Sequence, residues 1–304
     1  SKGDEFGQPG NVKSILFNGP FLLKSITSKS EITFEKNEEY WDKDNVHIDK
    51  IKLSYYDGSD QDSLARGFSD GSYTVARLFP ASSNFASVEK KYKDNIYNTQ
   101  PGAGVAVFGF NIDRQAYNHT SKTSDEQKSS TKKAILNKNF RQAITFALNR
   151  ENYSAQVNGK EYAKAAIRNM YTAPAFVQVN GKDFGDVVAD KLQTYGDQWS
   201  GVNLADSQDG LYNKDKAKAQ FEKAKAELQK EGVQFPIHLD VPVVQSSTNF
   251  VARMQSFKQS VEETLGTENV VVDLQMMDQD EVLNITLNVP SAAETDWDLQ
   301  GLVG

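Results

Sequence analysis

Alternating hydrophobic and polar positions predict several short β-strands in the first third of the 304-residue chain. Turn residues separate these runs, as in Asn18-Gly19-Pro20 before the first strand. Two intervening stretches, Ser59–Phe68 and Ser82–Lys93, instead fit short helices. The predicted strands are Phe21–Ser25, Ile32–Glu35, Ile48–Tyr55, Tyr73–Leu78 and Val105–Asn111.

Beyond residue 111 apolar residues recur every three to four positions instead of every second one, which predicts longer helices. One helix is expected over Asn139–Asn152, and another begins after Asn213, a favourable N-cap, and ends near Gly232. The polar stretch Asn118–Lys133 predicts an exposed loop. Residues 182–212 predict an extended segment held in place by its scattered large side chains. These are Tyr195, Trp199 and Leu211.

The clearest structural signal lies in residues 237–276. A strand over Ile237–Val243 is followed by a helix from about Ser247 to Leu265, and by a second alternating run that starts at Val270. A strand, a crossover helix and a strand in about forty residues predict a βαβ unit with parallel strands. The later part of the chain is therefore expected to be α/β.

Composition narrows the function classes. With 34 basic and 41 acidic residues the net charge is -7, and the two signs are interleaved along the chain. Nucleic-acid binding is therefore not expected, because it requires clustered Lys and Arg. No run approaches the roughly 18 apolar residues of a membrane span. The chain has no cysteine, which excludes disulfides and thiol chemistry within it.

No recognised catalytic or cofactor motif is present. His47, His119 and His238 lie far apart, outside any metal-binding spacing, and we expect structural or solvent roles for them. Gly102-Ala103-Gly104 is too short for a nucleotide-binding loop. Most acidic residues alternate with lysines on predicted helix faces, which is typical of solvated helices. We therefore expect no metal, no cofactor and no enzymatic activity, although paired carboxylates of a hydrolase would leave no sequence motif.

The end of the chain also carries information. Residues 297–304 read as a strand that stops within an apolar run, and the sequence starts without methionine. We therefore expect a segment truncated at both ends, in which the absence of a targeting signal says nothing about location.

Several motifs, in order along the chain, resemble the peptide-binding proteins of ABC importers, the oligopeptide- and dipeptide-binding solute-binding proteins. Asn18-Gly19-Pro20-Phe21 and Tyr40-Trp41-Asp42 are similar to the family's N/T-G-P-Y and Y-W stretches. Phe140–Arg150 resembles its V-R-Q-A-I-x-x-A-I-D-R helix, with Asn149 in place of the usual aspartate. The long polar stretches resemble the Gram-positive lipoprotein branch of this family.

The resemblance implies an α/β, two-lobed, periplasmic-binding-protein-like fold of class II, peptide-binding type. Residues 1–103 would form the later part of lobe one, and residues 104–304 most of the second large lobe, incomplete at its C-terminus. Such lobes close over an extended peptide that is held largely by main-chain hydrogen bonds. The implied partners are oligopeptides and permease subunits. The implied location is the outer face of the cell membrane, through a lipid anchor outside this segment, or the periplasm.

The same resemblance implies where a peptide would bind. Arg77, Leu78 and Phe79 would lie near the cleft, Gly102, Gly104 and Val107 along the crossing strand, and Gly304 on the far wall. For Arg77 and Phe79, a surface charge and a core aromatic are equally open interpretations, and the glycines could simply form a turn.

Trp41, in contrast, is expected to fill the core of lobe one together with Val46, Ile48 and Ile51. Two other functions stay open: a peptide-sensing receptor with the same fold, and a carboxylate-dependent hydrolase.

Overall fold

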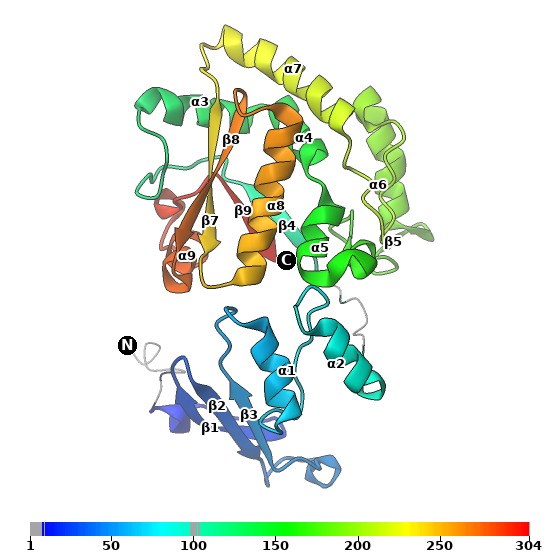
Figure 1. Cartoon of the computed structure of the whole chain (residues 1–304), viewed down its shortest axis with the longest axis vertical. Helices are drawn as coiled ribbons and strands as arrows, with labels where there is room; N and C mark the ends of the chain where they lie inside the picture. Colours follow the sequence, from blue (N-terminus) through cyan, green and yellow to red (C-terminus); the bar gives the residue numbers. More distant parts are fainter. Residues whose placement is uncertain (1–7, 9, 98–101, 103, 304) are drawn as a thin grey trace. The chain divides into compact units, whose positions relative to one another are not determined.

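The computed structural model describes residues 8, 10–97, 102 and 104–303 (Figure 1). The chain forms two compact units, residues 1–59 (unit 1) and 60–304 (unit 2). The lobe boundary at residues 103/104 stays a prediction. The predicted site residue Gly304 lies outside the described residues.

Unit 1 contains an antiparallel sheet of three strands, β1 (Phe21–Thr27), β2 (Glu31–Lys36) and β3 (Lys50–Ser54). Two short 3-10 helices, Val12–Ser14 and Lys43–Asn45, accompany it. The predicted burial of Trp41 is wrong: its side chain is 83% exposed and tilts against Tyr40, with 5.7 Å between ring centroids. The physical reason is that the described part of unit 1 contains no α-helix to pack over this turn, and Ile48 is exposed as well.

Unit 2 begins with the helices α1 (Gln61–Ser69) and α2 (Phe85–Lys91), followed by a 3-10 turn at Lys93–Asn95. Asp60 caps α1 by accepting hydrogen bonds from the backbone amides of Asp62 and Ser63. The predicted strand Tyr73–Leu78 is wrong, because these residues are irregular. The amide of Tyr73 donates to the carbonyl oxygen of Gly67, 2.9 Å away, and so folds the chain back onto the end of α1.

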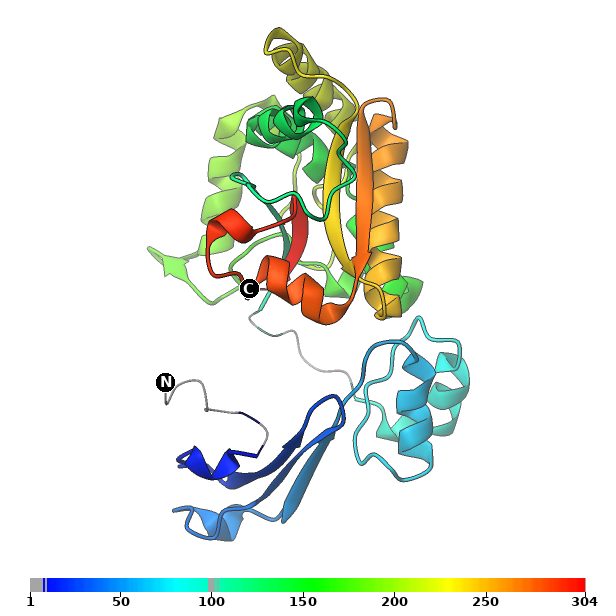
Figure 2. The ribbon, with the colours of Figure 1, turned by 90° about the vertical axis from the view of Figure 1, so that its left-hand side faces the viewer.

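The βαβ prediction is confirmed. Strands β7 (Ile237–Val244) and β8 (Val270–Met277) pair in parallel, with Ile237 opposite Val270. Helix α8 (Thr248–Leu265) connects them, and Figure 2 shows it lying against one side of the two strands. Its apolar stripe, which includes Met254, Phe257 and Val261, is buried. Helix α9 (Gln279–Thr286) and a 3-10 turn (Ala292–Glu294) follow β8.

Four further helices pack against the βαβ unit: α3 (Asp125–Leu136), α4 (Lys138–Ala147), α5 (Arg150–Tyr162) and α7 (Lys214–Lys230). The predicted loop over residues 118–133 is wrong in its second half, where α3 buries Ser130 and Thr131 on its inner face. The Thr131 hydroxyl donates to the carbonyl oxygen of His238 at 3.0 Å, so these polar residues suit a buried helix face. The predicted helix over residues 139–152 is split near Leu148, and Asn213 caps α7 as predicted.

Residues 182–212, predicted as an extended segment, contain regular elements, and so do residues 163–181 before them. They form the 3-10 turns Lys164–Ala166, Gln193–Tyr195 and Asp197–Trp199, the hairpin β5 (Gln178–Val179) and β6 (Lys182–Asp183), and helix α6 (Phe184–Leu192). Trp199 packs on the core, with its ring centroid 5.2 Å from that of Phe146, as the prediction of a pinned segment requires. Tyr195 does not, because it is 62% exposed.

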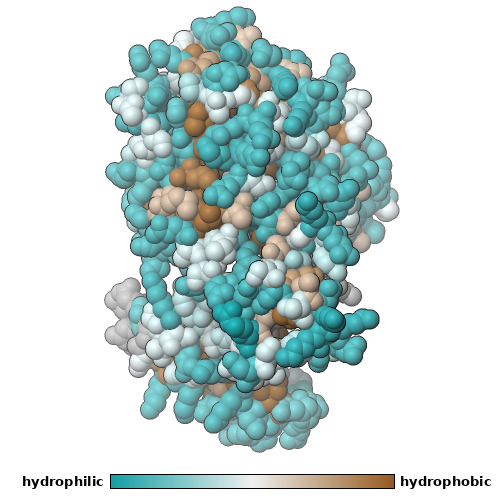
Figure 3. Space-filling model, in the orientation of Figure 1, coloured by the Kyte–Doolittle hydropathy of each residue, from teal (hydrophilic) through white to brown (hydrophobic). Residues whose placement is uncertain are grey.

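A second strand pair connects distant parts of the sequence. Strand β4 (Ala106–Phe110) pairs antiparallel with β9 (Leu299–Val303), with Phe110 opposite Leu299. The main core of unit 2 lies between these strands, β7, β8 and the surrounding helices. Hydrophilic residues dominate the face shown in Figure 3, with smaller hydrophobic groups between them. None of the helices among the described residues is both long enough and apolar enough to cross a membrane.

Candidate functional site

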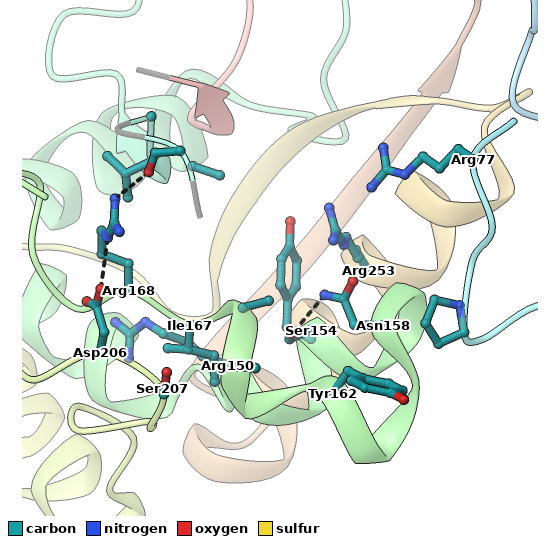
Figure 4. Close-up of a pocket in the computed structure, with 18 of the residues that line it drawn as sticks. Arg77, Arg150, Ser154, Asn158, Tyr162, Ile167, Arg168, Asp206, Ser207 and Arg253 are labelled. Atoms are coloured by element: carbon teal, nitrogen blue, oxygen red, sulfur yellow. Dashed lines mark hydrogen bonds and ion pairs between the residues drawn. The ribbon is translucent and has the colours of Figure 1, made fainter. Parts of the chain in front are cut away.

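Unit 2 contains a cavity of about 1770 Å³ (Figure 4). Helices α1, α2 and α5, strand β4 and the irregular segment 74–80 contribute to its lining, and α8 contributes Arg253 and Phe257. A cavity of this size exceeds the few hundred to a thousand cubic ångströms typical of small-molecule sites. It has room for a ligand larger than a single metabolite.

Five of the seven residues predicted from the resemblance lie along this cavity: Arg77, Leu78, Gly102, Gly104 and Val107. Phe79 is not among the lining residues; it is 6% exposed, which supports its interpretation as a core aromatic. A binding role for these five residues stays a prediction.

The segment 74–78 lines the cavity and is irregular. Within the described chain, the amides and carbonyls of Thr74 to Leu78 have no backbone hydrogen-bond partner. The segment is nevertheless fixed at its far end, because the amide of Ala81 donates to the carbonyl oxygen of Val157 in α5 at 3.3 Å. Unpaired but fixed main-chain groups are what an extended peptide needs in order to add to a protein by backbone hydrogen bonds.

Aromatic packing supports one wall of the cavity. Phe108 of β4 stacks on Phe257 of α8, with ring centroids 4.9 Å apart, and meets Tyr153 of α5 edge-on at 5.5 Å. Burial raises the pKa of Tyr153, which therefore stays neutral at physiological pH. These contacts hold β4, α5 and α8 together beneath the cavity, and the wall is therefore formed by packed elements.

Two cavity arginines are neutralised by aspartates. Arg150 donates to Asp209 both from its side chain, at 3.1 Å, and from its backbone amide, at 2.6 Å. Arg168 forms an ion pair with Asp206 at 3.2 Å and also donates to the carbonyl oxygen of Gly102 at 3.1 Å (Figure 4). The second contact ties the predicted residue Gly102 to the cavity wall.

Two other cavity arginines differ. Arg77 and Arg253 form no ion pair within the described chain, and the Nε atom of Arg253 is buried without a hydrogen-bond partner there. Figure 4 shows both on the same side of the pocket. Burial lowers the pKa of Arg253, and the neighbouring charge of Arg77 lowers it further. Sequence reasoning missed Arg253, although its position three residues after Phe250 and four before Phe257 places it on the buried face of α8.

A separate group of charges lies outside the cavity lining. Arg114 forms ion pairs with Asp240 at 2.6 Å and Asp296 at 2.8 Å, and Lys122 pairs with Asp240 at 2.6 Å and with Asp298. All five side chains are at most 2% exposed. We call these residues the buried charge cluster.

The buried charge cluster ties together three segments of the chain at or next to β4, β7 and β9. Its residues come from the loop after β4, from the middle of β7 and from the segment before β9. The amide of Asp298 also donates to the carbonyl oxygen of Asp240 at 3.0 Å. Burial alone would raise the pKa of Asp240, but Lys122 and further hydrogen bonds hold it at about 2. Asp240 is therefore ionised, and it contacts both cations of the cluster.

The cavity is poorly suited to carboxylate-dependent hydrolysis. A carboxylate-dependent hydrolase needs an acid and a base that reach the substrate. The acidic residues that line the cavity within the described chain are Glu89 and Asp206, and Asp206 is paired with Arg168. The site therefore offers binding groups and no pair of free carboxylates in the part that the structure describes.

Comparison with known proteins agrees with this geometry. Residues 2–301 match the bacterial extracellular solute-binding proteins, family 5 (middle region). The chain is 61% identical over 301 residues to the oligopeptide-binding protein AmiA of Streptococcus pneumoniae, covering 99% of this chain and 46% of AmiA. It is 59% identical over 304 residues to the oligopeptide-binding protein SarA of Streptococcus gordonii, covering 100% of this chain and 46% of SarA. The chain thus spans about half the length of these relatives.

Solved structures show the same fold. OppA of Listeria monocytogenes, solved with bound peptide, matches with a TM-score of 0.66 at 20% identity, covering 100% of this chain and 49% of OppA. The substrate-binding domain of an oligopeptide ABC transporter from Bacillus anthracis gives a TM-score of 0.66 at 18% identity, covering 96% of this chain and 46% of that one. The fold prediction is therefore confirmed, and the chain belongs to the bacterial extracellular solute-binding proteins of family 5.

Proposed function

We propose that this chain forms part of the peptide-binding cleft of the oligopeptide-binding component of an ABC importer. The observation that carries the proposal is the cavity of about 1770 Å³ bordered by the unpaired main-chain groups of residues 74–78. Main-chain pairing is indifferent to side-chain identity, so a protein that uses it can accept many peptide sequences. The names of AmiA and SarA as oligopeptide-binding proteins support the same ligand class.

The proposal includes the partners and the location of the full-length protein. It captures oligopeptides outside the cell without chemical turnover and delivers them to permease subunits, and a lipid anchor outside this segment holds it at the outer face of the membrane. Arg77, Leu78, Gly102, Gly104 and Val107 are the proposed ligand contacts in this chain, with Gly304 on the opposite wall.

The test uses the full-length protein, freed of bound peptide and then incubated with a mixture of synthetic peptides. Mass spectrometry of the protein fraction should recover intact peptides, and the unbound fraction should contain no new cleavage products. Appearance of shorter products would instead indicate a hydrolase. Failure to recover any peptide would contradict the proposal.

A second measurement separates transport from sensing. Deleting the gene should abolish uptake of labelled peptides that the purified protein binds. Unchanged uptake, together with intact peptide binding by the purified protein, would indicate a receptor that signals to another partner.

A further inference from the structure

Strand β8 has a free edge. Among the described residues it pairs with β7 alone, so the main-chain groups that face away from β7 have no neighbouring strand. Residues 270–277 read VVVDLQMM, an apolar run with one charge and several strongly β-forming residues. A free edge on such a segment is a template for pairing with another chain.

Two side chains of α8, which runs alongside β8 (Figure 2), occupy the middle of this edge. The amide of Val272 donates to the Glu262 carboxylate at 2.9 Å, and the Lys258 ammonium donates to the carbonyl oxygen of Val272 at 2.7 Å. Lys258 and Glu262 also form an ion pair at 2.6 Å. We call these two residues the edge pair. The edge pair fills both main-chain positions that a neighbouring strand would use at Val272.

The edge is occupied at its start and open at its end. The amide of Val270 donates to the carbonyl oxygen of Gly266, which follows α8, at 3.0 Å. Leu274 and Met276 alternate with Val272 on the same side, and within the described chain their main-chain groups have no partner outside the sheet. The stretch left open is therefore about three residues long, at the lower limit of strand length.

The edge pair differs from an ordinary ion pair on a helix surface, which is solvated and contacts nothing else. Gln259 and Glu263, one position further along α8, show the ordinary arrangement: they are hydrogen bonded to each other at 2.7 Å, and both are exposed. The Glu262 side chain is instead only 14% exposed, and both members of the edge pair contact Val272. Helix surface chemistry alone does not account for these contacts.

We propose that Lys258 and Glu262 prevent a second copy of the protein from adding a strand to β8. Two copies could pair their β8 edges about a two-fold axis, but only by breaking the ion pair and two charge-assisted hydrogen bonds. Without the edge pair, the buried main-chain groups of Val272 would lack partners, and an added strand would supply them. The inference goes beyond the proposed function, because neither β8 nor the edge pair lines the cavity.

The test compares two double variants of the full-length protein. Lys258→Ala with Glu262→Ala removes the edge pair, and Gln259→Ala with Glu263→Ala removes the neighbouring pair as a matched control. Alanine favours the helix in both cases. Sedimentation velocity over a series of concentrations measures self-association. The first variant should associate roughly tenfold or more tightly than the unmodified protein, because two main-chain groups become available for hydrogen bonds. The control should match the unmodified protein.

Two further variants locate the contact. Met276→Lys, added to the variant without the edge pair, places a charge at the open end of the same edge, where the side chain is 46% exposed. It should return self-association to the level of the unmodified protein. Lys258→Ala alone leaves the Val272 amide bound to Glu262 and should give a smaller increase, which keeps the test decisive if the double variant misfolds.

The contrary results are specific. Equal self-association of the unmodified protein, the control and the variants without Lys258 would overturn the proposal. Association that persists after Met276→Lys would also overturn it, because the contact would then lie away from the β8 edge.

Discussion

Asp240 and Arg253 lie in the same unit, but their charges meet different surroundings. Asp240 is fully buried, and it contacts both Arg114 and Lys122. Arg253 is partly buried beside a cavity and forms no ion pair within the described chain. In the first case each charge has a partner of opposite sign, and in the second the guanidinium of Arg253 has none among the described residues.

The difference shows two uses of charge in one fold. The buried charge cluster ties the loop after β4 to β7 and β9, and removing one of its members leaves an uncompensated ion in the interior. Arg253 contributes little to the stability of the chain, because within the described residues no carboxylate balances its partial desolvation. We therefore expect different responses to mutation: a large loss of stability in the cluster, and little or no loss of stability at Arg253.

The largest effect is expected for Asp240→Ala. This substitution removes the carboxylate that contacts Arg114, Lys122 and Thr120, leaving two buried cations with fewer partners. The free energy of unfolding should fall by about 3 to 5 kcal/mol, measured by urea denaturation of the full-length protein. Asp125→Ala is the control: that side chain is 98% exposed, and its change should be within about 0.5 kcal/mol. A similar small change for both variants would contradict the structural role of the cluster.

A smaller effect of opposite sign is expected for Arg253→Met. Methionine keeps most of the side-chain volume and removes a partly desolvated charge that has no carboxylate partner. The free energy of unfolding of the peptide-free protein should stay the same or rise by up to about 1 kcal/mol. A loss of more than about 2 kcal/mol would show that Arg253 is structural and would remove the contrast with Asp240.

The smallest effect concerns pH. Burial would lower the pKa of His119, but hydrogen bonds to Glu281 and Asp296 outweigh it and raise the pKa above its ordinary value of 6.5. The groups that face its ring are Glu281 on α9 and Asp296 before β9, while Arg114 donates to its carbonyl oxygen. Because the folded-state pKa is raised, this stabilisation is complete below about pH 6.5 and is lost as pH rises through the folded-state pKa.

His119→Gln should remove that pH dependence. The difference in unfolding free energy between the unmodified protein and the variant should amount to less than about 1 kcal/mol near pH 6 and shrink above about pH 8. Denaturation curves at several pH values provide the measurement. A difference that grows with rising pH would contradict the assignment of a stabilising charged histidine.

Regular patterns in the sequence predicted the regular parts of the fold. The alternation in β7 and β8 and the apolar stripe of α8 were sufficient for the βαβ unit, because each pattern reflects burial on one or both faces. Asn213 identified the start of α7 for the same local reason. The prediction failed for α3, where Ser130 and Thr131 are buried by tertiary hydrogen bonds that a hydropathy pattern does not record. It also failed for Trp41, since burial depends on what packs over a turn.

The site was predictable only in part. The resemblance placed Arg77, Leu78, Gly102, Gly104 and Val107 near a cleft, and the structure brings these residues to one cavity. Arg253 was missed because the cavity is assembled from segments that are distant in sequence, and only the fold brings these segments together. The buried charge cluster was missed for the same reason: its members come from three distant segments, each of which looks like ordinary surface charge when taken alone.

The most direct test of the account is a map of where a peptide lies on the full-length protein. A synthetic peptide carrying a photo-reactive residue is bound, irradiated, and its attachment sites are identified by mass spectrometry after proteolysis. We expect attachment within the cavity-lining segments, above all residues 74–80 and 104–108. Attachment confined to residues outside the cavity, such as those on α3 or α7, would contradict the claim that this cavity holds the peptide.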